Sequence, residues 1–311
     1  MPIQALDTST DMPNWNELLD EIKKAHNIYD ATRRKYLRRL NRYTQRNVIL
    51  YYSGWLQSPG PASNTAINDP DMIGFMSACN KLDKNVGLDL ILHTPGGDLA
   101  ATEAIVNYLH GQFGDIRVVV PQLAMSAGTI MACSATSIVM GKQSSLGPID
   151  PQLSGMSALA ILEEFEQAHK EIQNDPSRAA VWQPIIVKYS PTLIGECQKA
   201  MKWSKDIVRD WLVKGMLKDD RYRKKKANAI VEELGSHSLT LSHSRHLSAE
   251  RCRDLGLVIE MLEDDKKLQD HVLSVHHCCM HTLAKTHATK IIENHLGVAY
   301  VNMVQPVMIG D

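Results

Sequence analysis

The strongest constraint on the fold is an alternation of apolar strand-like and helix-like segments between residues 47 and 141. Segments rich in β-branched, aromatic and other apolar residues predict strands at 47–56, 87–93, 116–121 and 137–141. The segments between them are helical in spacing or composition, at 69–82, 98–113 and 124–135. This alternation is typical of a largely parallel sheet with helices on its faces. We therefore expect an α/β fold.

The flanking segments predict helical extensions around this core. Residues 14–45 carry apolar positions at helical spacing without Pro or Gly, and residues 157–234 are mainly helical in pattern. Residues 236–262 predict a strand, a helix and a strand, and the following residues predict a polar helix and a strand at 299–304. We expect an N-terminal helical extension (1–46), an α/β domain (47–262) and a C-terminal tail (263–311) for oligomerisation or partner contact.

The composition narrows the class of protein. Lys and Arg number 34 against 35 Asp and Glu, a balance that argues against nucleic acid as the main partner. The basic runs 33–42 and 221–226 are typical of exposed helix faces. Six cysteines without disulfide-scaffold or CxxC spacing indicate a reducing, cytoplasmic setting. With no secretory signal and no apolar run of about 20 residues, we expect a soluble protein.

Gly96 and Gly97 lie where a predicted buried strand meets a predicted helix, in LDLILHTPGGDLAATEAI (88–105). Glycine permits backbone conformations and close approaches that a side chain would block. A helix N-terminus offers unpaired N–H groups to a negatively charged group. The glycine motifs of nucleotide sites are absent here. The stretch therefore predicts backbone donors for another kind of ligand, with a tight turn as the alternative.

Ser126 lies at the next predicted strand-to-helix turn, in VVVPQLAMSAGTIMACSA (118–135). The predicted helix is rich in Ala, Gly and Ser, which leaves the hydroxyl unshielded at an N-terminus that favours developing negative charge. A serine beside a glycine pair suits acyl transfer, because one segment supplies the nucleophile and backbone N–H groups supply the oxyanion hole. A helix cap is the structural alternative for this serine.

Three ordered motifs, LHTPGG, VPQLAMSAGTIMACSA and SIVMGKQSSLGPIDPQ, resemble the Clp protease/crotonase superfamily. Within it, the chain is most similar to the signal peptide peptidase A-like branch, the serine dehydrogenase proteinase family. RHLSAERCRDLGLVIEM (245–261) is similar to the closing helix-strand element of the family. The resemblance runs from about 47 to 262. It implies a Clp/crotonase-type spiral of β-β-α units with a mainly parallel sheet, forming a serine peptidase domain.

The resemblance also implies roles for particular residues. Ser126 corresponds to the nucleophile of the family. Gly97 and Ala127 correspond to the residues whose N–H groups form the oxyanion hole, and Gly96 shapes the turn. A substrate carbonyl oxygen held between those two amides would lie near the serine hydroxyl.

The general base departs from the Clp pattern. Clp-type enzymes place a histidine where this chain reads GPIDPQ (147–152), and no histidine occurs between residues 111 and 168. The signal peptide peptidase A branch uses a buried lysine instead. Lys188 in IIVKYSPT is the first candidate, because the lysine of that branch lies shortly before a Ser-Pro. Lys170 is the second, because its spacing from Ser126 is nearer to that of short family members. A histidine base remains an alternative, from His237, His243 or His246.

Two further residues are candidates for contacting substrate or orienting the base. His93 ends the predicted strand before the glycine pair, and a core position is its alternative role. Asp150 follows a turn in GPIDPQ, where turn chemistry is the alternative role. The His- and Cys-rich segment 271–281 predicts helix packing, because adjacent His-His and Cys-Cys pairs point in different directions on a helix. We expect no metal and no cofactor.

The residues and the resemblance together predict a cytoplasmic serine endopeptidase with a Ser–Lys dyad that cleaves polypeptide through an acyl-enzyme. The resemblance implies a homo-oligomer of single or stacked rings. A membrane-proximal partner or an ATPase is a further expected partner, since the chain carries no ATPase motif. Two alternatives stay open: a catalytically inactive assembly or binding module, and a crotonase-like enzyme that handles acyl-CoA thioesters.

Overall fold

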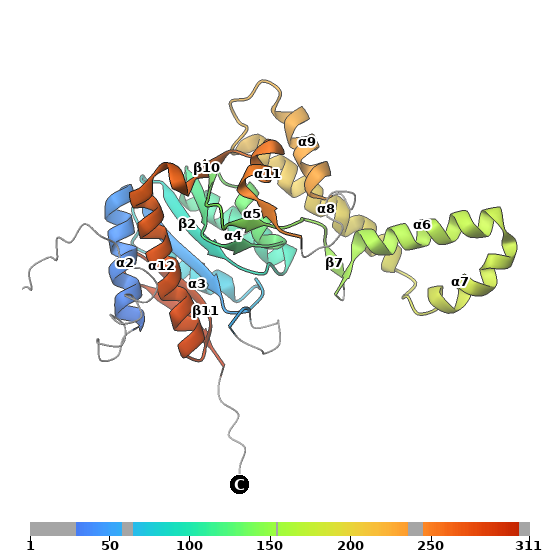
Figure 1. The fold of residues 1–311 in the computed structure, drawn as a ribbon, viewed down its shortest axis with the longest axis horizontal. Coiled ribbons are helices and arrows are strands. Elements are labelled where there is room, and N and C mark those ends of the chain that lie inside the picture. The colour runs from blue at the N-terminus through green and yellow to red at the C-terminus, as the bar shows by residue number, and fades with distance from the viewer. Residues whose placement is uncertain (1–28, 58–64, 154, 236–244, 305–311) are drawn as a thin grey trace, which may run out of the picture.

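The computed structural model describes residues 29–57, 65–153, 155–235 and 245–304, built around a seven-stranded sheet (Figure 1). The strands lie in the order β10-β5-β3-β2-β1-β11-β12. Their bounds are Asn47–Ser53 (β1), Leu88–His93 (β2), Ile116–Val120 (β3), Ser137–Met140 (β5), Ile259–Met261 (β10), Ala288–Asn294 (β11) and Ala299–Met303 (β12). The four strands predicted between residues 47 and 141 are therefore confirmed.

Most of the sheet is parallel. The strands from β10 to β1 run parallel, whereas β11 and β12 are antiparallel at one side. Every residue of β1, β2 and β11 is buried, because helices cover both faces of the sheet. The expected α/β fold is confirmed. Pattern analysis does not identify β11, since its short apolar run is flanked by Lys290 and Glu293, which are buried in ion pairs.

One face of the sheet is covered by the first and last helices of the described chain, α2 (Tyr29–Thr44) and α12 (Lys266–Lys285), which lie side by side (Figure 1). Leu37, Val272 and Ile291 are part of the core beneath them. The helix predicted over 271–281 is confirmed, with most of that segment buried. The described part of the expected N-terminal extension thus packs on the central sheet, and the expected C-terminal tail packs on it through α12 and adds the strands β11 and β12 to it. Residues 14–28 lie outside the described chain.

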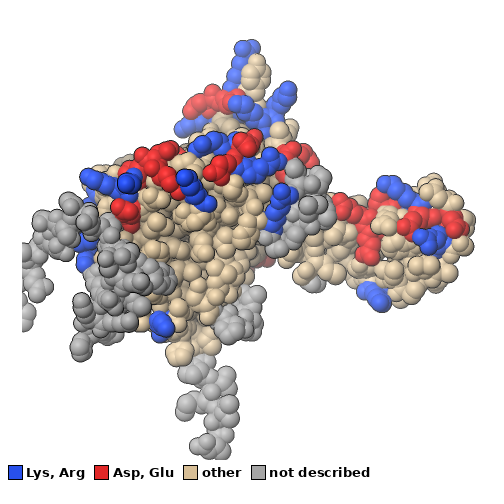
Figure 2. Space-filling view, viewed as in Figure 1, with Lys and Arg blue, Asp and Glu red and all other residues tan. Residues whose placement is uncertain are grey.

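The opposite face carries the elements that build the candidate site. A second hydrophobic core lies between this face and the helices that cover it, and it includes Phe75, Ile105, Ile130, Val208 and Ile230. The helices are α3 (Asp71–Cys79), α4 (Leu99–Gln112), α5 (Ala127–Cys133), α9 (Arg223–Leu234), α11 (Ala249–Asp254) and the C-terminal half of α8 (Leu193–Lys214). The basic run 221–226 is exposed around the start of α9, near the top of the space-filling view (Figure 2).

A small second sheet corrects one predicted boundary. The prediction of a helix over 124–135 is wrong at its start, because Ala124 belongs to β4 (Leu123–Ala124) and pairs with Leu146. Strand β4 lies beside β6 (Ser145–Leu146), which pairs with β9 (Leu247–Ser248). The helix begins only at Ala127, so Ser126 lies at the turn between strand and helix. The strand predicted from residue 236 falls partly outside the described residues.

Residues 152–203, which we call the arm, project from the rest of the molecule, which we call the body (Figure 1). Ile161, Leu193 and Cys197 contribute to a small core of its own. The arm contains β7 (Gln152–Leu153), β8 (Met156–Ser157), α6 (Ala158–Asn174), the 3-10 turn Pro176–Arg178, α7 (Ala179–Ile186) and the start of α8. Helix α8 continues from the arm into the core of the body, where Val208 and Leu212 are buried.

None of the helices in the described residues is both long enough and apolar enough to cross a bilayer.

Candidate active site

The glycine pair lies between strand β2 and helix α4, as the sequence predicts. Asp98 caps α4 by accepting a hydrogen bond from the Ala101 amide at 2.8 Å. Gly96 has φ +99°, and a Cβ there would lie 2.7 Å from the Met125 carbonyl oxygen and 2.8 Å from Ser126 Cβ. Gly96 is therefore required both by its backbone conformation and by the close approach of the serine turn.

Gly97 is held against a segment that lies outside both strand and helix. The Ile67 amide donates to the Gly96 carbonyl at 2.8 Å, and the Asp98 amide donates to the Ile67 carbonyl at 2.9 Å. A Cβ on Gly97 would lie 2.3 Å from the backbone nitrogen and oxygen of Ile67. These two hydrogen bonds flank Gly97 and leave its own N–H without an acceptor among the described residues.

Ser126 adopts a backbone conformation that is rare for a residue with a side chain. Its φ is +52° and its ψ is −117°, between β4 and α5. Such strain is typical of functional turns that the surrounding structure enforces. The alternative role as a helix cap is contradicted, because the Ser126 side chain makes no capping hydrogen bond. The hydroxyl is thus available for other chemistry.

Ser126, Gly96, Gly97 and Ala127 line a single pocket of about 580 Å³. The Ala127 nitrogen would lie 3.0 Å from a Cβ placed on Gly96, so the serine turn and the glycine turn are in contact. Within the described chain the Ala127 amide, like that of Gly97, has no hydrogen-bond acceptor. Apolar side chains complete the walls, among them Ile130, Ile149 and Trp203. The arrangement places one hydroxyl beside two free backbone donors.

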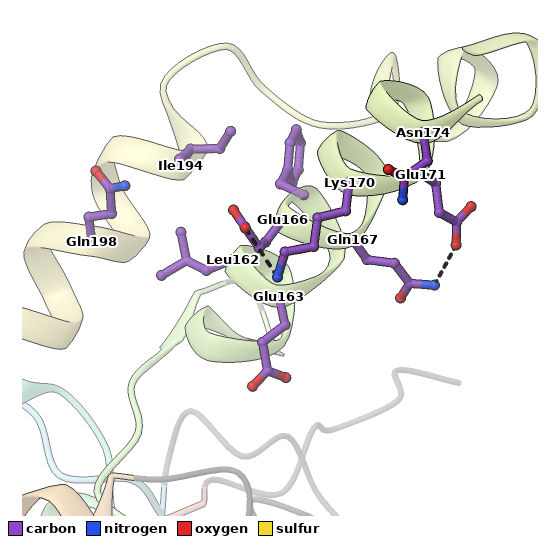
Figure 3. Close-up of a pocket in the computed structure, with 10 residues that line it drawn as sticks. Leu162, Glu163, Glu166, Gln167, Lys170, Glu171, Asn174, Ile194 and Gln198 are labelled. Carbon is purple, nitrogen blue, oxygen red and sulfur yellow. Dashed lines mark hydrogen bonds and ion pairs between the residues drawn. The ribbon is translucent and has the colours of Figure 1, made fainter. Parts of the chain in front are cut away.

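The described residues that line this pocket include neither lysine nor histidine. Lys188 is exposed and follows α7 in the arm. Lys170 is also exposed and forms a 3.3 Å ion pair with Glu166 on α6. It lines a different groove, of about 810 Å³, between α6 and the start of α8, where Ile194 and Gln198 face it (Figure 3). Within one chain, the structure therefore brings neither candidate base to Ser126.

His93 lies on the opposite side of the sheet from the serine pocket. Its ring is fully buried against Trp55 and His276, with ring centroids 4.4 and 5.5 Å away. Burial lowers the pKa of His93 to about 3, so the ring is neutral at pH 7. The side chain occupies the core position that was its alternative role. Of the remaining histidine candidates, His246 is exposed, and His237 and His243 lie outside the described residues.

Asp150 lies next to the pocket but is not among its lining residues. It accepts a hydrogen bond of 2.9 Å from the Ser157 hydroxyl, and that hydroxyl in turn caps α6 by accepting from the Ala160 amide. Asp150 is 5% exposed, so its carboxylate is buried where the pocket wall meets the start of α6. It thus connects the pocket wall to the base of the arm.

Two residues of the site carry no signal in the sequence. Ile67 contacts Gly97 through backbone atoms alone, so its residue type is no guide to its role. Trp203 lines the pocket from α8 and donates from Nε1 to Glu103 on α4 at 3.1 Å. The spacing of apolar residues around Trp203 does not distinguish a residue that lines a pocket from one that packs in the core. Only the packing of α8 on α5 brings it to the pocket.

The structure thus places a strained serine turn against a glycine pair on one face of a mainly parallel sheet. The chain belongs to the family described as ClpP-like SDH-type serine proteinase, whose model matches residues 19–274. This match confirms the resemblance drawn from the motifs.

Two relatives come from Methanocaldococcus jannaschii. The chain is 29% identical over 185 residues to the uncharacterized protein MJ1495, covering 60% of this chain and 56% of that protein. It is 30% identical over 186 residues to the uncharacterized protein MJ0137, covering 60% and 58%. The chain thus spans less than two thirds of the length of either relative. Among solved structures, it is similar to a mutant of the 1510-N membrane-bound stomatin-specific protease, at 15% identity over 65% of this chain and 78% of that one, with a TM-score of 0.39.

Proposed function

We propose that this protein is a serine endopeptidase that uses Ser126 as its nucleophile. The Ser126 oxygen attacks a peptide carbonyl carbon, and a base takes the hydroxyl proton. The tetrahedral intermediate then expels the amine, which receives that proton, and water hydrolyses the resulting acyl-enzyme. One observation carries this proposal: a strained Ser126 shares a pocket with the free amides of Gly97 and Ala127.

The oxyanion hole in this proposal consists of the two free amides. Gly97 and Ala127 donate to the oxygen that becomes negatively charged when Ser126 attacks, and Gly96 allows the two turns to touch. Each such donor contributes about a hundred- to a thousandfold in rate in related chemistry. The amides are fixed by backbone hydrogen bonds on either side, so little reorganisation is needed during the reaction.

The proposed base is a lysine from the arm of another copy of the chain. Lys188 is the first candidate and Lys170 the second, and both lie on an arm that projects away from the body holding Ser126 (Figure 1). A lysine acts as a base when burial favours its neutral amine. Contact between an arm and the pocket of a second copy would supply that burial. The Ser–Lys dyad therefore implies a homo-oligomer in which each site is shared.

The substrate class proposed is polypeptide, cleaved in the cytoplasm. Gln152 and Gly155 of the β7–β8 hairpin line the pocket, so a bound polypeptide would lie against this hairpin. All six cysteines are free and buried, which supports a reducing compartment. A catalytically inactive binding module is the second candidate, favoured by the lack of lysine and histidine among the described residues of the pocket.

Hydrolysis of a fluorogenic peptide or of casein tests the proposal. We expect the wild type to cleave and Ser126→Ala to lose most of its rate, up to about a millionfold as in other serine proteinases. Ser177→Ala is the matched control, since Ser177 is an exposed serine of the arm whose hydroxyl bonds Asp175. Equal activity in wild type and Ser126→Ala would contradict the proposal.

A further inference from the structure

A buried lysine on β11 lies beneath the segment that contacts the glycine pair. The Lys290 side chain is fully buried, and its Nζ donates to Asp71 Oδ1 at 2.8 Å, to Asp71 Oδ2 at 2.9 Å and to the Ala66 carbonyl at 2.7 Å. An ammonium group has three N–H donors, so all three are in use. Lys290 is therefore a fixed structural cation, and its proton is not free for catalysis.

The Asp71 carboxylate also holds the other end of this segment, residues 66–68. Asp71, at the start of α3, accepts from the Tyr51 hydroxyl at 2.9 Å and from the Asn68 amide at 3.1 Å. Lys290 thus holds Ala66 by its carbonyl, while Asp71 holds Asn68 by its amide. Ile67 lies between the two attachment points. The network determines where the Ile67 backbone lies, although no strand or helix contains this residue.

The Ile67 backbone connects this network to the proposed oxyanion hole. Its amide binds the Gly96 carbonyl and its carbonyl binds the Asp98 amide, one residue on each side of Gly97. The Gly97 backbone approaches Ile67 so closely that no Cβ fits between them. Ala66 itself lines the pocket of Ser126. A displacement of residues 66–68 would therefore move the Gly97 amide relative to Ser126.

We infer that Lys290 is a positioning residue for the oxyanion hole, acting through Ala66 and Ile67 on the Gly97 amide. The inference rests on the proposed function, in which that amide receives the negative oxygen. It assigns a role in the site to the C-terminal part of the chain, more than 150 residues after Ser126 in sequence. Because amides act on the transition state rather than on bound substrate, the role predicts an effect on kcat and little effect on KM.

The test separates positioning from stability by removing the network in two ways. Lys290→Met leaves Asp71 as a buried charge without its cation, so this variant is expected to unfold at a lower temperature than wild type. The double variant Lys290→Met/Asp71→Asn removes both charges and is expected to regain most of the lost thermal stability. The Ala66 carbonyl has no lysine donor in either variant. We therefore expect kcat to stay about tenfold or more below wild type in both, with KM within about twofold.

The matched control is a second buried ion pair that includes a residue of β11. Glu293 accepts from Arg33 Nε at 2.5 Å, and both side chains are fully buried on α2 and β11. Arg33→Met/Glu293→Gln removes a pair of similar burial without touching Ala66 or Asp71. We expect this variant to keep the kcat of the wild type at a temperature where it is folded.

Two readouts distinguish the outcomes. Hydrogen exchange of the peptide that covers residues 94–99 is expected to rise by about tenfold or more in the Lys290 variants and to stay at the wild-type rate in the control. An active wild type with wild-type kcat in the folded double variant would overturn the role of Lys290 and leave the proposed peptidase intact. A wild type that neither cleaves peptide nor reacts with a fluorophosphonate would overturn the proposed function, and with it the catalytic role of Lys290.

Discussion

The body holds several ion pairs in its interior, whereas the arm carries its ion pairs at the surface. In the body, Lys290 and Asp71 are both fully buried, and Asp89 is 1% exposed between Arg46 and Arg117. In the arm, Lys170 and Glu166 are 66% and 60% exposed, and both signs of charge cover its surface (Figure 2). Buried pairs fix geometry, while exposed pairs stay adaptable. Ser126 and the amides of Gly97 and Ala127 lie together within one chain, whereas the proposed base is the part that a second copy would supply.

Apart from loss of Ser126 itself, the largest effect is expected from the arm lysine that we propose as the base. Lys188→Met should lower kcat by about a hundredfold to ten thousandfold, because a general base contributes that much to proton transfer. Mixing Lys188→Met chains with Ser126→Ala chains should restore part of the activity, since a mixed oligomer pairs an intact serine with an intact lysine.

The peptide-cleavage rate of each variant alone and of the mixture measures this effect. Lys170→Met is the matched variant and should stay active if Lys188 is the base. Full activity in both single variants would show that neither Lys188 nor Lys170 is the base. Loss of activity without recovery on mixing would place serine and lysine in the same chain.

A comparably large effect is expected in the body at Gly96. Gly96→Ala would drive a methyl group into the Met125 carbonyl and the Ser126 side chain, so the amides and the serine separate. We expect kcat/KM to fall by about a hundred- to a thousandfold. Gly195→Ala in α8 of the arm is the control, because nothing lies within 4 Å of its Cβ position. Equal rates for the two alanine variants would show that the close contact is not functional.

An intermediate effect concerns the pH dependence of stability. The pKa of His93 falls from 6.5 to about 3 on folding, so the unfolded chain binds its proton first as the pH drops. The neutral His93 ring therefore contributes to the free energy of unfolding above pH 6.5. This contribution falls by about 1.4 kcal/mol per pH unit as the pH drops from 6.5 towards 3.

Unfolding free energies at pH 7 and pH 5 measure this slope. His93→Phe should flatten it, while His246→Phe, at an exposed position, should leave it unchanged. Burial also lowers the pKa of His276 and His277, so both contribute in the same direction and a residual slope should remain in His93→Phe. An identical slope in wild type and His93→Phe would contradict the assignment.

The smallest effect is expected at the surface of the arm. Lys170→Met removes an exposed ion pair with Glu166, and such pairs contribute about 0.5 kcal/mol or less. The free energy of unfolding in denaturant should therefore match wild type within that margin. A loss of several kcal/mol, as expected for a buried pair, would show that the arm is covered in solution.

The sequence predicts those parts of the fold and site whose signals are local. The strand-turn-helix patterns around Gly96 and Ser126 place the two turns in neighbouring units of a parallel sheet, and the structure brings them into contact. Only the structure excludes the helix-cap role of Ser126, because the positive φ of this residue and its missing capping hydrogen bond have no sequence signature.

The remaining parts depend on contacts between distant segments. Lys290 and Asp71 lie 219 residues apart in sequence, so no spacing pattern reveals their pairing. The short apolar run of β11 is flanked by Lys290 and Glu293, whose buried partners no local pattern reveals. Likewise, the spacing of Lys188 from Ser126 carries no information on the direction in which the arm projects.

The most direct test of the account is where a fluorophosphonate reacts. The wild type is treated with the probe, digested, and mapped by mass spectrometry, with Ser126→Ala treated in parallel. The account predicts a single adduct on Ser126 and none in the variant, because only this serine combines a free hydroxyl with two free amides in one pocket of the described chain. An adduct on another serine, or equal labelling of wild type and Ser126→Ala, would contradict it.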